Sequence, residues 1–233
     1  MQSQNDLVAS SLEPLLACIQ RWITSEGFAP LTVPTKFARL TGSWHNRHLS
    51  LETYRYSHPD LIHLSLALLQ EGEACRAVTL YALPRPSLAL PILGLDYVGF
   101  GGQLTLAALD LAPTEQAFWE RQAKPLLTAL QSDREELIAR RLPAFAMNVF
   151  SDRPLIVAAK TQVGIERAVR HACTTLNHYR EWLNQPEQTT HTQSDRLRNW
   201  CQAMANNKKE SGALGQMFGT QAQAYLEDYL FAA

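Results

Sequence analysis

The 233-residue sequence lacks the features that mark several common protein classes. Its four cysteines are widely scattered and form no C-x-x-C pair, so the sequence predicts neither a zinc site nor a disulfide framework. No stretch approaches the roughly 18 consecutive apolar residues of a membrane span. Residues 1–22 also lack the basic start and unbroken apolar run of a signal peptide, so we expect a cytoplasmic protein.

An excess of charge is also missing. The 21 lysines and arginines nearly balance the 22 aspartates and glutamates, which gives a formal net charge of -1. This balance does not favour binding to nucleic acid or to an anionic membrane, so a charged partner would need a local patch. The segment "GFGG" at residues 99–102 has neither the spacing nor the setting of a dinucleotide fingerprint, and no phosphate-binding loop or G-x-S-x-G elbow occurs. A redox enzyme with this sequence would therefore take its electrons from outside these cofactor motifs.

The order of the patterns that are present predicts an α+β protein. A helical apolar period covers residues 6–26 and ends at Gly27, whereas the alternation typical of strands dominates from Pro34 to Leu111. The five strand-like runs lie at residues 48–56, 61–69, 74–83, 92–100 and 104–111. Thr114 is placed to cap a following helix, with Glu115 in its first turn. A last strand is expected at 154–160, and helices at 161–184, 193–206 and 212–231. We expect a single domain over residues 1–233, with helices covering both faces of one antiparallel sheet.

Polar residues inside the apolar strands are the informative positions. Asp96 has no cation beside it in the sequence, and burial would raise its pKa, so it could donate a proton or act as counter-ion to a cationic ligand. Alternation puts His63 and Ser65 on one face of their strand, where a histidine among leucines is more often a satisfied core residue than a catalyst. Asp110, just before a helix, is expected to be a turn or cap carboxylate.

Several segments in the right order resemble the ferredoxin-dependent bilin reductases. The longest is "YALPRPSLALPILGLDYVGFGGQLTLAALDLAPT", with a proline-rich turn, P-x-x-G-x-D and a strand ending D-L-x-P. The segments "VPTKF", "LPAFAMNVFSDRPLIV" and "GALGQMFGTQAQAYLEDYLF" resemble further landmarks of the family, and "IHLSLA" is similar to a strand of its phycocyanobilin-forming members.

This resemblance implies a three-layer α/β/α sandwich with a central antiparallel sheet, and a linear tetrapyrrole held between the sheet and the C-terminal helices. Members of the family bind no metal or flavin. A reduced [2Fe-2S] ferredoxin supplies single electrons, and the protein supplies protons. Asp96 matches the central catalytic aspartate of the family, and His63 matches a histidine of the phycocyanobilin-forming members, so both are predicted to be catalytic.

The sequence also departs from the family pattern. Ser65 and Thr79 stand where phycocyanobilin-forming members have a glutamate and a histidine, and are expected to contact substrate. A second family aspartate is replaced by Asn207 or Lys208, both expected to contact substrate, so its proton would come from another donor, such as His63 or water. By position, Lys209 and Lys160 are candidates to bind the propionates of the bilin, or to be solvated surface lysines. A basic patch of Arg140, Arg141 and Arg153 is expected to dock the acidic ferredoxin.

Three functions follow from the resemblance. The first is reduction of biliverdin IXα or 15,16-dihydrobiliverdin to a phycobilin, in which heme oxygenase or a second bilin reductase is a further partner through substrate channelling. The second is a bilin carrier that has lost proton donors, and the third is a reductase of an open-chain chlorophyll catabolite. The sequence does not determine which double bond is reduced.

Overall fold

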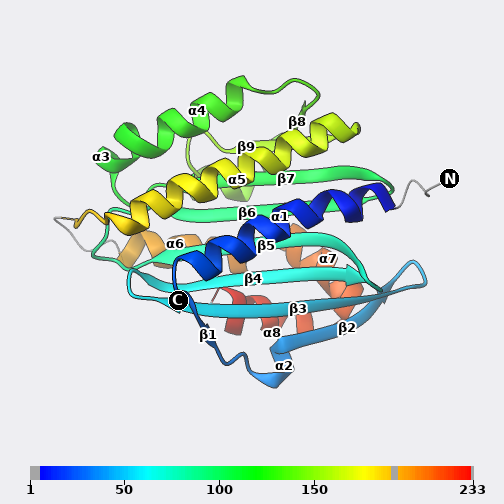
Figure 1. The fold of residues 1–233 in the computed structure, drawn as a ribbon. Coiled ribbons are helices and arrows are strands. Elements are labelled where there is room, and N and C mark those ends of the chain that lie inside the picture. Colours follow the sequence, from blue (N-terminus) through cyan, green and yellow to red (C-terminus); the bar gives the residue numbers. More distant parts are fainter. Residues whose placement is uncertain (1–5, 190–193, 232–233) are drawn as a thin grey trace.

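A nine-stranded antiparallel sheet forms the centre of the computed structural model, which describes residues 6–189 and 194–231 (Figure 1). The strand order is β1-β3-β4-β5-β6-β7-β9-β8, and β2 also pairs with β3. The strands are β1 (Ala29–Leu31), β2 (Arg39–Trp44), β3 (Arg47–His58), β4 (Leu61–Glu71), β5 (Ala74–Pro84), β6 (Ile92–Phe100), β7 (Gln103–Ala112), β8 (Ile138–Ala139) and β9 (Leu155–Ala159).

The five strand-like runs of the sequence correspond to β3 to β7, which form an antiparallel meander, and the expected last strand is β9. Successive side chains in each of these strands point to opposite faces of the sheet, so a period of two residues identifies the strands. The sequence did not predict β1, β2 and β8. Two of these, β1 and β8, are only three and two residues long, too short to carry a period.

Helices cover both faces of the sheet, which confirms the three-layer α/β/α arrangement (Figure 1). One face packs against α1 (Asp6–Ser25), α5 (Gln162–Asn184) and the segment α3 (Gln116–Phe118), η1 (Trp119–Ala123) and α4 (Lys124–Ser132). The other packs against α6 (Ser194–Ala205), α7 (Lys208–Phe218), α8 (Gln221–Tyr225) and the π-helical turn η3 (Leu226–Leu230). Two short helices, α2 (Thr35–Ala38) and the 3-10 turn η2 (Ala144–Asn148), lie in connections.

Two expectations about helix ends are wrong. The helix after β7 is capped by Glu115, whose carboxylate accepts hydrogen bonds from the backbone N–H of Ala117 and Phe118. Thr114 is buried and instead donates to the carbonyl oxygen of Leu90, with an O–O distance of 2.7 Å. The helix expected at 212–231 begins at Lys208 and is interrupted at Gly219, whose φ of 68° is a left-handed conformation that glycine adopts without strain.

Over residues 6–189 and 194–231, no helix is both long and apolar enough to cross a lipid bilayer. The cytoplasmic location stays a prediction.

Candidate active site

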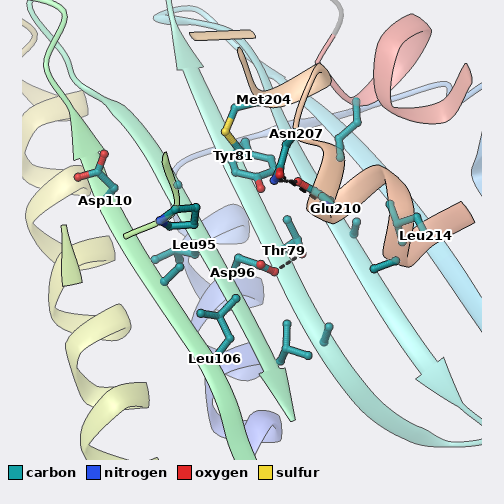
Figure 2. Close-up of a pocket in the computed structure, with 18 of the residues that line it drawn as sticks. Thr79, Tyr81, Leu95, Asp96, Leu106, Asp110, Met204, Asn207, Glu210 and Leu214 are labelled. Atoms are coloured by element: carbon teal, nitrogen blue, oxygen red, sulfur yellow. Dashed lines mark hydrogen bonds between the residues drawn. The ribbon is translucent and has the colours of Figure 1, made fainter. Parts of the chain in front are cut away.

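A cavity of about 700 Å³ lies between the sheet and the C-terminal helices (Figure 2). Its floor comes from β3 to β7 and β9, its cover from α6, α7, α8 and η3, and one side from residues 140–150. Most lining side chains are apolar. The polar ones are Thr79, Tyr81, Asp96, Thr105, Asp110, Arg140, Arg141, Asn207, Glu210 and Tyr225. A mostly apolar cavity of this volume is typical of a binding site for a small molecule or cofactor.

Asp96 lies in the floor of this cavity, as the sequence predicts. Strand register places it directly between Thr79 on β5 and Ala108 on β7, on the face that the C-terminal helices cover. The Thr79 hydroxyl donates a hydrogen bond of 2.8 Å to Oδ1 of Asp96, which leaves Oδ2 for a ligand. Burial raises the pKa of Asp96, and the Thr79 hydrogen bond lowers it by a smaller amount. The carboxyl group is therefore biased toward its protonated form.

Glu210, which sequence reasoning missed, brings a second carboxyl group to the same cavity from the first turn of α7 (Figure 2). The amide of Asn207 donates to Oε2 of Glu210 at 3.2 Å. Burial raises the pKa of Glu210 to about 8, helped by the negative charge of Asp96 and opposed by the Asn207 hydrogen bond. The sequence analysis missed Glu210 because it expected the C-terminal helix to begin at residue 212, whereas α7 begins at Lys208.

Asp110 also borders the cavity, but its carboxylate is already occupied. It is 4% exposed and lies within β7, not in a turn or cap, so this expectation is wrong. The backbone N–H of Ser151 donates to Oδ2 at 3.0 Å, and the Ser151 hydroxyl donates to Oδ1. Burial raises the pKa of Asp110 to about 6, against the opposing effect of these hydrogen bonds. Asp110 thus ties β7 to the segment that precedes β9.

The structure does not bring His63 and Ser65 to the cavity surface. Both are buried on the face that carries Asp96, but neither lines the cavity. Ser65 accepts a hydrogen bond from Nε of Arg55 at 3.3 Å, and Arg55 also donates to the carbonyl oxygen of Tyr229. Burial, with the charge of Arg55 adding to it, lowers the pKa of His63 to about 3. An imidazole that is neutral near pH 7 is a poor acid, and this one does not line the cavity. Neither its charge state nor its position supports the predicted catalytic role.

The basic residues divide into two groups. Arg140 and Arg141 are exposed and line the cavity, where the backbone N–H of Arg140 donates to the carbonyl oxygen of Ile156 at 2.9 Å. The other cations predicted to act at the site, Lys160, Lys208 and Arg153, are exposed and are not among the lining residues. The side chain of Lys209 lies outside the described part of the structure. Asn207 lines the cavity, as predicted.

The described residues contain no group of three or more His, Cys, Asp or Glu side chains that could hold a metal ion. The carboxyl groups of Asp96 and Glu210 offer acid–base chemistry within apolar walls and beside two arginines.

Comparisons with known proteins identify the family of this chain. A family model described as ferredoxin-dependent bilin reductase matches residues 16–232. The chain therefore belongs to the ferredoxin-dependent bilin reductase family, as the resemblance predicted.

Two similar curated proteins are phycocyanobilin:ferredoxin oxidoreductases. That of Synechococcus sp. is 30% identical over 95 residues, which cover 41% of this chain and 38% of the relative. That of Trichodesmium erythraeum is 29% identical over 113 residues, which cover 48% and 45%. The matched segments thus span less than half the length of these relatives.

A solved structure of tomato phytochromobilin synthase in complex with biliverdin shares the fold. It has a TM-score of 0.76 and 16% sequence identity, and the match covers 94% of this chain and 82% of the tomato chain. At this identity the likeness shows the fold alone.

Proposed function

We propose that this protein reduces a linear tetrapyrrole, biliverdin IXα or 15,16-dihydrobiliverdin, to a phycobilin with electrons from a reduced [2Fe-2S] ferredoxin. The observation that carries the proposal is Asp96, a carboxyl group with a raised pKa at the floor of a cavity of about 700 Å³, in a chain of this family. The chain would act as one domain, without a bound cofactor of its own.

The chemistry of the reaction sets what the cavity has to supply. Reduction of one carbon–carbon double bond consumes two electrons, one from each of two ferredoxins, and two protons. Protonation of a pyrrole nitrogen or lactam oxygen by Asp96 makes the tetrapyrrole a cation, which accepts an electron more easily. The Asp96 carboxylate that remains stabilises this cation inside apolar walls, where a charge interaction is stronger than in water.

The arginines that border the cavity suit the two propionate groups of a bilin. Arg140 and Arg141 are exposed residues that line the cavity, and guanidinium groups match carboxylates in charge and geometry. We assign them to propionate binding. The docking of ferredoxin on a patch of Arg140, Arg141 and Arg153 stays a prediction.

An anaerobic assay with biliverdin, ferredoxin and a system that keeps ferredoxin reduced tests the function. We expect the wild type to convert the bound-bilin spectrum to that of a blue-shifted product, identified by chromatography. A bound-bilin spectrum that does not change under reducing conditions would instead support a carrier.

Asp96→Asn tests the central role. The amide has the same shape but no acidic proton, so we expect bilin binding to persist and turnover to fall at least about 100-fold. Asp195→Asn is the matched control, because Asp195 is an exposed residue of α6 whose carboxylate pairs with Arg198. Normal turnover by Asp96→Asn would show that the proposed role is wrong.

A further inference from the structure

Three carboxyl groups line the cavity, and the two whose oxygens Ser151 does not occupy, those of Asp96 and Glu210, come from different walls. Asp96 belongs to the sheet, whereas Glu210 belongs to the first turn of α7, and Figure 2 shows the two side chains on these two elements. Each is half-buried and lines the cavity. They are close enough for the charge of Asp96 to raise the pKa of Glu210. A planar ligand in this cavity would therefore meet one acid from the sheet and one from the helical cover.

The local structure holds Glu210 in place. Asn207 precedes α7 and its side-chain Oδ1 accepts from the backbone N–H of Glu210 at 3.5 Å, while its Nδ2 donates to Oε2 of the same residue. The backbone carbonyl of Asn207 accepts from the N–H of Ser211 at 2.9 Å, which begins the helix. This reciprocal pairing resembles a capping box, and it fixes the carboxyl group at the helix N-terminus.

The charge state of Glu210 suits a proton donor. Its pKa of about 8 keeps it protonated at neutral pH, chiefly because burial disfavours the carboxylate. The negative charge of Asp96, present once that group has lost its proton, adds to this effect. Once the proton has left, the positive end of the α7 dipole and the Asn207 amide stabilise the carboxylate.

The other titratable groups that line the cavity are less suitable. Asp110, with a pKa of about 6, is mostly ionised at neutral pH, and Ser151 occupies both of its oxygens. Burial raises the pKa of Tyr81 and of Tyr225, and the Tyr225 hydroxyl is hydrogen-bonded to Thr53 at 3.0 Å. Arg140 and Arg141 are the basic groups of the lining.

We propose that Glu210 is the second catalytic acid of this site, which protonates the side of the tetrapyrrole that faces α7 while Asp96 protonates the side that faces the sheet. The proposal rests on the proposed function. Two electrons from two reduced ferredoxins and two protons, one from each carboxyl group, convert one C=C bond to CH–CH. Two carboxylates remain, and water at the open side of the cavity returns their protons. The position of Glu210 thereby selects which edge of the substrate receives the second proton.

Glu210→Gln tests the proposal by its effect on the second half of the reaction. We expect the variant to bind biliverdin, to take up the first electron and the proton from Asp96, and then to accumulate a bilin radical visible by electron paramagnetic resonance. Steady-state turnover should fall about 100-fold. Glu210→Asp, which keeps the acid on a shorter side chain, should recover part of this loss. Glu227→Gln, an exposed position in η3, is the control for a charge change in the same helical layer.

The pH profile is a second readout. Wild-type turnover should fall as pH rises above about 8, because the protonated form of Glu210 disappears. Glu210→Gln should lack this fall. A variant that keeps wild-type turnover and the same fall above pH 8 would overturn the proposal.

An infrared measurement separates this proposal from the proposed function. The spectrum of the wild-type protein minus that of Glu210→Gln should contain the C=O stretch of a protonated carboxyl group at pH 7, without any substrate. Absence of this band would overturn the assignment of Glu210 even if the enzyme reduces biliverdin. If the band is present but the wild type reduces no bilin, the proposed function fails and the proposal for Glu210 as a catalytic acid fails with it.

Discussion

The two faces of the central sheet are made by alternate residues of the same strands, but they are packed in opposite ways. Towards α1 and α5, Leu80 and Leu93 are fully buried, and the Tyr97 hydroxyl donates to the carbonyl oxygen of Ala168 at 2.8 Å. Towards the C-terminal helices, Thr79 and Asp96 border a cavity. The difference shows how a densely packed face holds the strands in register while the other face leaves room for a ligand.

Substitution of two neighbours on β5 should give the largest contrast in stability. Leu80→Ala removes a fully buried side chain and leaves a cavity, so we expect the free energy of unfolding to fall by about 2–5 kcal/mol. Thr79→Val removes only the hydrogen bond to Asp96, and water in the cavity can still solvate that carboxyl group. The free energy of unfolding should therefore fall by about 1 kcal/mol or less. Urea denaturation of both variants measures the contrast.

Thr79→Val carries a second expectation that Leu80→Ala does not. The variant should raise the pKa of Asp96 further, because the Thr79 hydrogen bond lowers it. Equal destabilisation by the two substitutions would contradict the distinction between the packed and the open face.

Removal of the Ser151 hydroxyl should have an intermediate effect that depends on pH. Ser151→Ala deletes a hydrogen bond to Asp110, so we expect a loss of about 1–2 kcal/mol at pH 8, where the carboxylate is charged. At pH 5 the loss should be smaller, because Asp110, with a pKa of about 6, is then mostly neutral. Urea denaturation at the two pH values tests this. A loss that is larger at pH 5 would show that Ser151 does not stabilise the charged form.

His63→Gln should have the smallest effect on activity. His63 is 5% exposed and does not line the cavity, so most of the turnover should remain. A loss of about 100-fold would instead support the sequence-based prediction that His63 is catalytic.

The same variant should change the acid sensitivity of folding. A folded pKa of about 3 lies below the unfolded value of 6.5, so the unfolded chain binds the extra proton and stability falls as pH drops from about 6.5 towards 3. Without His63 this contribution, at most about 1.4 kcal/mol per pH unit, should disappear. Unfolding free energies at pH 7.5 and pH 5 measure it. An unchanged pH dependence would show that His63 is not kept neutral by burial.

The sequence predicted the meander, its alternation and Asp96, because each depends on residues close together in the chain. It also predicted that Thr79 and Asn207 would lie at the site, through the family resemblance. It placed His63 and Ser65 there as well. Ser65 instead accepts a hydrogen bond from Arg55, which also donates to the carbonyl oxygen of Tyr229, far away in the sequence. Alternation identifies the face of a strand but not what covers that face.

Periodicity and motif order, which are local properties, determined the α+β class, the family and the aspartate at the floor of the cavity. Tertiary structure alone decided that Ser151 hydrogen-bonds one carboxylate and that a helix beginning at Lys208 brings Glu210 close to another. The physical reason is that the pKa and the role of a buried carboxyl group depend on its distance from groups that the folded chain brings together.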